Sequence, residues 1–337
     1  MIMLKHRLVG LLSLSALLFG APALQAEEEV VIYSARKEHL LKPLLDAYRQ
    51  KTGVATRYLT DGEGPLLARL QAEGSDTPAD MLITVDAGNL WQAGEKGILA
   101  TVDSKLLKDN IPERLRDPKN QWFGMTVRAR TVVYSTERVK PADLSTYEDL
   151  AEPKWKGRLC LRSSEKIYNQ SMVAMMIARQ GEAATEKIVR GWVANLAVPV
   201  FSNDTKLMEA IVAGKCDVGI VNTYYFGTLK KEKPATPVAL FWPNQNGSGT
   251  HINISGAGVT RHAKHPAAAI QLLEWFSTPD AQRLFADLNM EYPANTTVKP
   301  HESVAAWGEF KGEDLNVSLA GKYQADAVRL MDRAGYK

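Results

Sequence analysis

Tyrosine side chains supply the part of this sequence best suited to chemistry. Tyr224 and Tyr225 are adjacent; they follow a strand-like run at 219–222 and open onto a helical pattern at 226–233. At a junction between strand and helix, neighbouring side chains can project from one end of a sheet, where open α/β folds bind ligands. The N-terminus of such a helix favours an ionised phenol. A chance pair is the alternative, since the chain contains 11 tyrosines.

Tyr168 repeats this arrangement. It follows a strand-like run around Cys160 and a polar turn at 162–166, and it falls in the first turn of a helical pattern. If Cys160 and Cys216 are bonded, the strands that they open lie close together. Tyr168 and Tyr224 then emerge at the same edge of the sheet.

Three phenolates together would supply hard oxygen donors and three negative charges. This set suits a hard, triply charged ion better than Zn²⁺ or Cu⁺. Free tyrosine titrates near pH 10, so only a strongly polarising ion holds several phenols ionised at neutral pH. Fe³⁺ is the natural candidate. The six histidines are scattered and give little support to an imidazole-based site.

The two cysteines, Cys160 and Cys216, favour one disulfide, because their number is even and the chain carries an export signal. The alternative is a pair of metal ligands, but the remaining ligands at short spacing are missing.

That export signal is the N-terminal segment, which we interpret as a signal peptide over residues 1–26. Lys5 and Arg7 precede an apolar stretch from Leu8 to Phe19, and small residues follow up to Ala26. The stretch is shorter than the roughly 20 residues that span a bilayer. We expect a free protein of a bacterial periplasm, since neither cysteine stands at the cleavage site to carry a lipid.

Short strand-like runs alternate with helical patterns along the chain, which indicates an α/β fold with mostly parallel sheet. The expected strands are 30–34, 81–84, 131–134, 157–162, 198–201 and 219–222. The expected helices are 38–50, 66–73, 167–179, 206–213, 226–233, 267–276 and 279–288.

Composition excludes several other classes of protein. Lys and Arg number 41 against 38 for Asp and Glu, and no basic run or RNA-binding motif suggests nucleic acid as a partner. The common phosphate-loop, dinucleotide, zinc-protease and serine-hydrolase motifs are missing, so we expect no enzyme.

Several segments, in order along nearly the whole mature chain, resemble the periplasmic ferric-iron-binding proteins of ABC transporters, a type II solute-binding family. They are Tyr33-Ser-Ala-Arg36, Pro78-Ala-Asp80, Arg128-Ala-Arg130, Arg162-Ser-Ser164, Ile167-Tyr168-Asn169-Gln170, Asn222-Thr-Tyr224-Tyr225 and Ser255-Gly-Ala-Gly-Val259. The resemblance implies two lobes joined by crossing hinge strands, Fe³⁺ bound by Tyr168, Tyr224 and Tyr225, and delivery of iron to an inner-membrane permease.

One segment departs from the family pattern. Relatives with larger ligand sets place a His-Tyr pair where this chain has Lys37 and Glu38. The resemblance then implies a three-tyrosine site completed by a synergistic anion such as carbonate. Arg128 is our first candidate to bind that anion, because a guanidinium pairs with such anions in a bidentate way. Arg36 is the second candidate, and Glu38 as a direct ligand is the alternative.

The length of the mature chain favours two lobes over one core. We expect an N-terminal lobe of residues 27–127 plus 254–300 and a C-terminal lobe of residues 128–253 plus 301–337, in a monomer. The main alternative function keeps this fold but binds a metal-free anion or organic solute, such as a phosphonate or carboxylate, through Arg36, Arg128 and Arg162. A colourless complex would mark that alternative.

Overall fold

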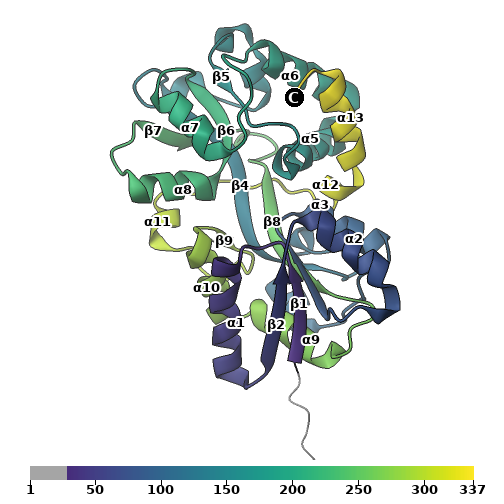
Figure 1. The fold of residues 1–337 in the computed structure, drawn as a ribbon. Helices are drawn as coiled ribbons and strands as arrows, with labels where there is room; N and C mark the ends of the chain where they lie inside the picture. Colours follow the sequence, from purple (N-terminus) through teal and green to yellow (C-terminus); the bar gives the residue numbers. More distant parts are fainter. Residues whose placement is uncertain (1–28) are drawn as a thin grey trace, which may run out of the picture.

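A computed structural model of the chain describes residues 29–337 and contains two α/β lobes, one above the other in Figure 1. The segment interpreted as a signal peptide, 1–26, lies outside the described residues. Among residues 29–337, none of the helices has the length and apolar character needed to cross a membrane.

The lobe that contains the first strand is built around parallel pairs. Strand β1 (Glu29–Ser34) lies between β2 (Ala55–Thr60) and β3 (Met81–Thr84), and it runs parallel to both. The helices of this lobe are α1 (Glu38–Thr52), α2 (Glu63–Glu73), α3 (Ala87–Glu95), α4 (Lys105–Asn110), α9 (Pro266–Phe276) and α10 (Pro279–Asn289). We call it the N-lobe.

The other lobe, which we call the C-lobe, contains β5 (Leu159–Cys160) parallel to β6 (Val218–Asn222). Strand β7 (Val238–Phe241) belongs to the same lobe. Its helices are α5 (Ile167–Gln180), α6 (Glu182–Ala194), α7 (Asp204–Val212), α8 (Thr223–Glu232) and α13 (Gln324–Arg333).

Two long strands connect the lobes. The first half of β4 (Phe123–Ser135) pairs antiparallel with β8 (Ile252–Val259), and its second half pairs with β6 and β7. All 13 residues of β4 are buried, as expected for a strand covered on both faces. Because β4 and β8 run antiparallel to their neighbours, the sheet is mixed, and it is parallel only away from the crossing. The expectation of two lobes joined by crossing strands is confirmed.

The remaining short elements lie where the chain returns between the lobes. They are β9 (Tyr292–Pro293), which pairs with β4, and the helices α11 (Glu302–Ala305) and α12 (Leu319–Lys322). The segment between α11 and α12 is bridged at Gly312 to Thr250, just before β8. In Figure 1 these elements lie at the waist of the molecule.

Separate apolar clusters fill the two lobes. The N-lobe core contains Ile32, Leu44, Leu82, Phe123 and Phe276, all fully buried. The C-lobe core contains Trp155 and Trp192, and a further cluster packs β6 against α7 and α8. Each lobe therefore has its own hydrophobic core, as two-lobe organisation requires.

A disulfide joins Cys160 to Cys216, with 5.9 Å between the Cα atoms. Cys160 ends β5, and Cys216 lies two residues before β6, so the bond links the end of one strand to the segment that leads into its paired neighbour. The sequence prediction of this disulfide is confirmed, and with it the side-by-side placement of the segments leading to Tyr168 and Tyr224.

One expected strand does not form. Residues 198–201 make only an isolated bridge, between Phe201 and Arg162. Pro199 lacks the N–H group that a sheet ladder needs, which explains the interruption. The helix expected at 206–213 begins at Asp204, and Asn203 caps it by accepting a hydrogen bond from the backbone N–H of Lys206.

Candidate metal centre

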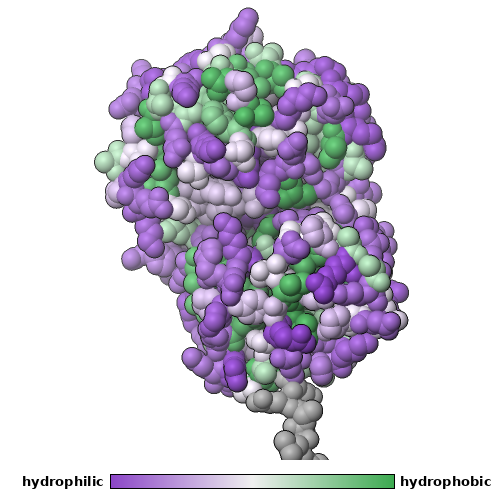
Figure 2. All heavy atoms as spheres, viewed as in Figure 1, coloured by the Kyte–Doolittle hydropathy of each residue, from purple (hydrophilic) through white to green (hydrophobic). Residues whose placement is uncertain are grey.

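A cavity of about 470 Å³ lies between the lobes, and the three tyrosines line it together. Figure 2 shows that the surface narrows between the two lobes and that hydrophilic residues cover most of this face. The C-lobe wall is formed by Arg162, Lys166, Tyr168, Thr205, Tyr224, Tyr225 and Thr228. The N-lobe and the crossing strands contribute Arg36, Lys37, His39, Glu63, Arg128, Ser255 and Glu291, among others.

Tyr224 and Tyr225 lie in the first turn of α8, directly after the buried strand β6. Their ring centroids are 4.5 Å apart. The Nδ2 of Asn222 donates a hydrogen bond to the Tyr224 hydroxyl over 3.0 Å. The abrupt change from strand to helix is what turns two consecutive side chains toward one cavity.

Tyr168 is the second residue of α5 and is buried. Three cations surround its ring: Lys166 Nζ at 4.9 Å, and the guanidinium carbons of Arg128 at 5.2 Å and Arg162 at 5.5 Å from the centroid. Such contacts are favourable for a neutral ring and more so for a phenolate. The structure thus brings the three predicted tyrosines together in a basic environment.

Burial raises the pKa of Tyr168 to about 12, although the Arg128 charge acts in the opposite direction. Burial and the neighbouring Tyr168 and Tyr225 phenols likewise raise the pKa of Tyr224 well above its ordinary value. Without a bound ion these hydroxyls hold their protons at neutral pH. Three phenols that share a cavity become phenolates only where a strong Lewis acid replaces the protons.

Arg128, on β4, has the properties expected of an anion-binding residue. It is 2% exposed, yet neither Nη1 nor Nη2 has a hydrogen-bond partner among residues 29–337. The closest carboxylate is that of Asp86, with an Nη2 to Oδ2 distance of 3.5 Å. Asp86 itself caps α3 and accepts hydrogen bonds from Gly88, Ser171 and Asn253. A buried guanidinium with free donors at a cavity wall is suited to a bidentate anion.

Arg36 lines the same cavity, but its donors are largely used within the protein. Its Nη2 lies 3.1 Å from the Glu291 carboxylate, and its Nη1 donates to Ser255 Oγ over 3.3 Å. Arg162 is paired with Asp204 at 3.5 Å. Of the three arginines in the cavity, Arg128 is therefore the one least engaged by the protein.

Three residues of the cavity wall were not predicted as site residues from the sequence. They are His39 and Glu63 on the N-lobe wall and Lys166 on the C-lobe wall. His39 follows the end of β1, and Glu63 follows the end of β2, so their places after parallel strands were a usable signal. Glu38 is not part of the cavity wall. Its carboxylate accepts a hydrogen bond from the Tyr58 hydroxyl over 2.8 Å.

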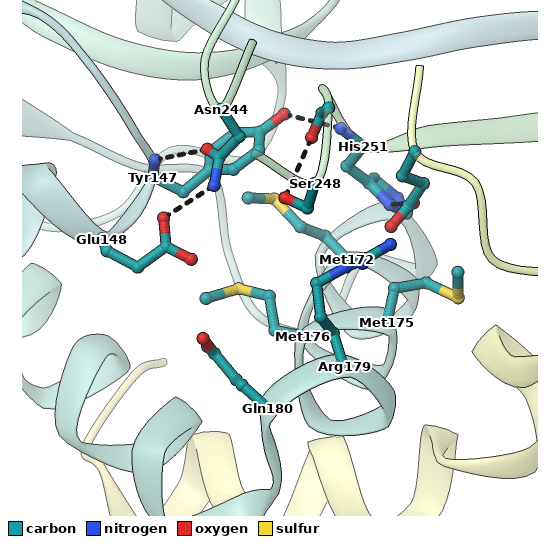
Figure 3. A pocket seen from close by; sticks show the side chains of 12 residues that line it. Tyr147, Glu148, Met172, Met175, Met176, Arg179, Gln180, Asn244, Ser248 and His251 are labelled. Atoms are coloured by element: carbon teal, nitrogen blue, oxygen red, sulfur yellow. Dashed lines mark hydrogen bonds and ion pairs between the residues drawn. The ribbon is translucent and has the colours of Figure 1, made fainter. Parts of the chain in front are cut away.

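A second, much smaller cavity of about 30 Å³ lies farther along α5, toward its C-terminal end (Figure 3). Met172, Met175 and Met176 line it, with the buried pair of His251 and Glu313 at one end. It has room for about one water molecule, so it is not a site for a transported solute. Within residues 29–337, no group of three or more His, Cys, Asp and Glu side chains is arranged to hold a metal.

Comparison with curated proteins gives iron-related relatives over most of the chain. The chain is 41% identical to iron uptake protein A1 of Synechocystis sp., over 92% of this chain and 88% of that protein. It is 28% identical to the Fe(3+)-binding periplasmic protein of Serratia marcescens, over 97% and 96% of the two chains.

Solved structures give the same picture. The Trichodesmium protein IdiA, or FutA, in complex with iron and citrate is 42% identical, with a TM-score of 0.88 over 92% of this chain and all of that one. Ferric iron-binding protein A of Mannheimia haemolytica in an open conformation is 36% identical, with a TM-score of 0.86 over 92% and 99% of the two chains. The expected two-lobed periplasmic-binding-protein fold is therefore confirmed.

A family model described as bacterial extracellular solute-binding protein matches residues 44–312. With this match, the shared fold and the interlobe cavity, the chain belongs to the bacterial extracellular solute-binding protein family.

Proposed function

We propose that this protein is the substrate-binding component of a ferric-iron ABC transporter, which captures Fe³⁺ between its lobes and delivers it to an inner-membrane permease. One observation carries the proposal: three phenol side chains, which follow two disulfide-linked strand segments, line one cavity with a buried guanidinium whose Nη atoms make no hydrogen bond within residues 29–337. The relatives named for iron uptake and ferric-iron binding support it.

In this proposal Tyr168, Tyr224 and Tyr225 are the protein ligands of the transported ion. Their ionised oxygens match the charge and hardness of Fe³⁺, and Lys166 and Arg162 offset part of the negative charge. Arg128 binds a synergistic anion such as carbonate through its free Nη donors, with Arg36 as a lesser contributor because Glu291 engages it.

Several wider features belong to the same proposal. The protein acts as a monomeric, non-enzymatic carrier of the bacterial periplasm, exported by the segment 1–26, with no nucleic acid as a partner. Its lobes comprise residues 27–127 plus 254–300 and residues 128–253 plus 301–337. The separate apolar cores support two lobes, with the first half of β4 in one core and its second half in the other.

The test is a visible absorption titration of iron-free protein with ferric citrate. We expect a broad phenolate-to-iron charge-transfer band that saturates at a single equivalent of iron. The Tyr225→Phe variant removes one hydroxyl and is expected to weaken or shift the band.

Tyr323→Phe is the matched control, because Tyr323 lies outside the interlobe cavity. A wild-type protein without any band would contradict the proposal. It would favour the alternative of a metal-free anion or organic solute bound by the arginines.

A further inference from the structure

The N-lobe side of the interlobe cavity carries two carboxylates, Glu63 and Glu291, and the protein itself engages only one of them. Glu291 is 2% exposed and lies 3.1 Å from Arg36 Nη2, and it also accepts a hydrogen bond from Thr126 Oγ1 over 3.0 Å. Glu63 is the first residue of α2 and is half-buried. Its carboxylate has neither a hydrogen bond nor an ion pair within residues 29–337.

Glu63 lines the same cavity as Tyr168, Tyr224 and Tyr225, which belong to the opposite lobe. A carboxylate and phenolates that share a cavity repel one another when all are ionised. A cation placed between them reverses the sign of this interaction.

We propose that Glu63 is a fourth protein ligand of the transported Fe³⁺, supplied by the N-lobe. This inference rests on the proposed function. A carboxylate oxygen is a hard donor, which Fe³⁺ prefers over the imidazole nitrogen of the exposed His39. Glu38 stands outside the cavity wall and is bound by Tyr58, so it does not compete for this role.

Because Glu63 belongs to the N-lobe, an ion bound by Glu63 and the tyrosines would hold the two lobes together. Tyr168 and the Tyr224-Tyr225 pair belong to α5 and α8 of the C-lobe, whereas Glu63 belongs to α2 of the N-lobe. An ion shared by both sets links the two lobes directly. Loss of the Glu63 ligand therefore affects both the affinity for iron and the compactness of the iron-loaded protein.

The experiment compares Glu63→Gln with Glu38→Gln in the full-length mature chain. Both variants replace one N-lobe carboxylate by an amide of equal size, but only Glu63 lines the cavity. Iron-free proteins are titrated with ferric citrate and followed by the charge-transfer band. Small-angle X-ray scattering then gives the radius of gyration of each loaded protein.

We expect Glu63→Gln to bind iron roughly tenfold or more weakly, with a shifted band maximum and a larger radius of gyration when loaded. Glu38→Gln is expected to match the wild type in all three readouts. Equal affinity and an identical band in wild type, Glu63→Gln and Glu38→Gln would overturn the role of Glu63 while leaving tyrosine-bound iron intact. A wild type without a band would overturn the proposed function itself, and this inference with it.

Discussion

At the scale of single residues, the arginines that line the cavity differ in whether the protein itself uses their hydrogen-bond donors. Arg36 is paired with Glu291, whereas the two Nη atoms of Arg128 make no hydrogen bond among residues 29–337. Burying guanidinium donors without hydrogen-bond partners is costly, so such donors at a cavity wall are expected where a ligand supplies the missing hydrogen bonds.

Replacing Arg128 by Gln is expected to lower iron affinity about tenfold and to remove its dependence on added bicarbonate, because the anion loses its bidentate partner. Titration by the charge-transfer band with and without bicarbonate measures both effects. Arg57→Gln, which alters an exposed pair with Glu29, is the control. An Arg128→Gln variant that responds to bicarbonate as the wild type does would rule out this role.

The raised phenol pKa values predict how iron binding depends on pH. Burial raises the pKa of Tyr168 to about 12, so its proton is present throughout the neutral range and must leave when iron binds. Affinity should therefore rise with pH, by up to about tenfold per unit for each proton released. Competition titrations at about pH 6 and about pH 8 measure the slope. An affinity independent of pH would mean that the phenols are not ionised on binding.

At the scale of elements, side-chain bonds in the C-lobe fix the start of β6, the strand that leads to Tyr224 and Tyr225. Besides the disulfide, Asp217, just before β6, accepts hydrogen bonds over 2.6 Å from both Arg138 and Arg158. Burial alone would raise the pKa of Asp217, but these two guanidinium groups outweigh it and hold the pKa below its ordinary value. The start of β6 is thereby tied to the segments after β4 and before β5.

Asp217→Asn is expected to lower the free energy of unfolding by about 1–2 kcal/mol at neutral pH, because two charge-assisted hydrogen bonds are weakened. Since the folded pKa is depressed, the contribution is present above the unfolded value of about 3.9 and is lost as pH falls through the folded value. Urea unfolding at neutral and acidic pH tests both statements. A stability difference that persists in strong acid would contradict the ionic origin.

At the scale of the whole molecule, side chains from both lobes already meet beside the cavity. Ser171 of α5 donates to the fully buried Asp86 of the N-lobe, and Gln324 connects Gln92 to Gln170 through hydrogen bonds. These contacts join the N-terminal end and the middle of α3 to α5 and to the first residue of α13. A ligand held by both walls of the cavity adds to them, so its binding is linked to the stability of the whole fold.

Loading with Fe³⁺ is expected to raise the melting temperature, in proportion to the logarithm of free iron, because iron binds only the folded chain. At free iron near a thousand times the dissociation constant, the gain in stability is about 4 kcal/mol. Differential scanning calorimetry before and after removal of iron by a chelator measures it. Tyr225→Phe should show a much smaller gain, and an equal gain in both proteins would place iron outside the tyrosine site.

The α/β class, the disulfide and the position of each tyrosine before or at the start of a helix could all be predicted from the amino-acid sequence. The disulfide followed from the even number of cysteines in an exported chain. The other features depend on neighbours in the chain: the apolar run that makes β6, the cap at Asn203 that starts α7, and the residues that open α5 and α8. The strand predicted from the local pattern at 198–201 was wrong, because Pro199 lacks the N–H group that a strand ladder needs.

Which charged side chains remain free to bind a ligand depends on the tertiary structure. Arg36 and Glu291 are 255 residues apart in the chain, yet they form a buried pair, and Tyr58 engages Glu38 from the neighbouring strand. Glu63 and Arg128, by contrast, both line the cavity. Neither the Glu63 carboxylate nor the Nη atoms of Arg128 make a hydrogen bond within residues 29–337. The physical reason is that the packing of elements distant in the chain decides which partner each charged group meets. A local pattern of residues contains no information about that packing.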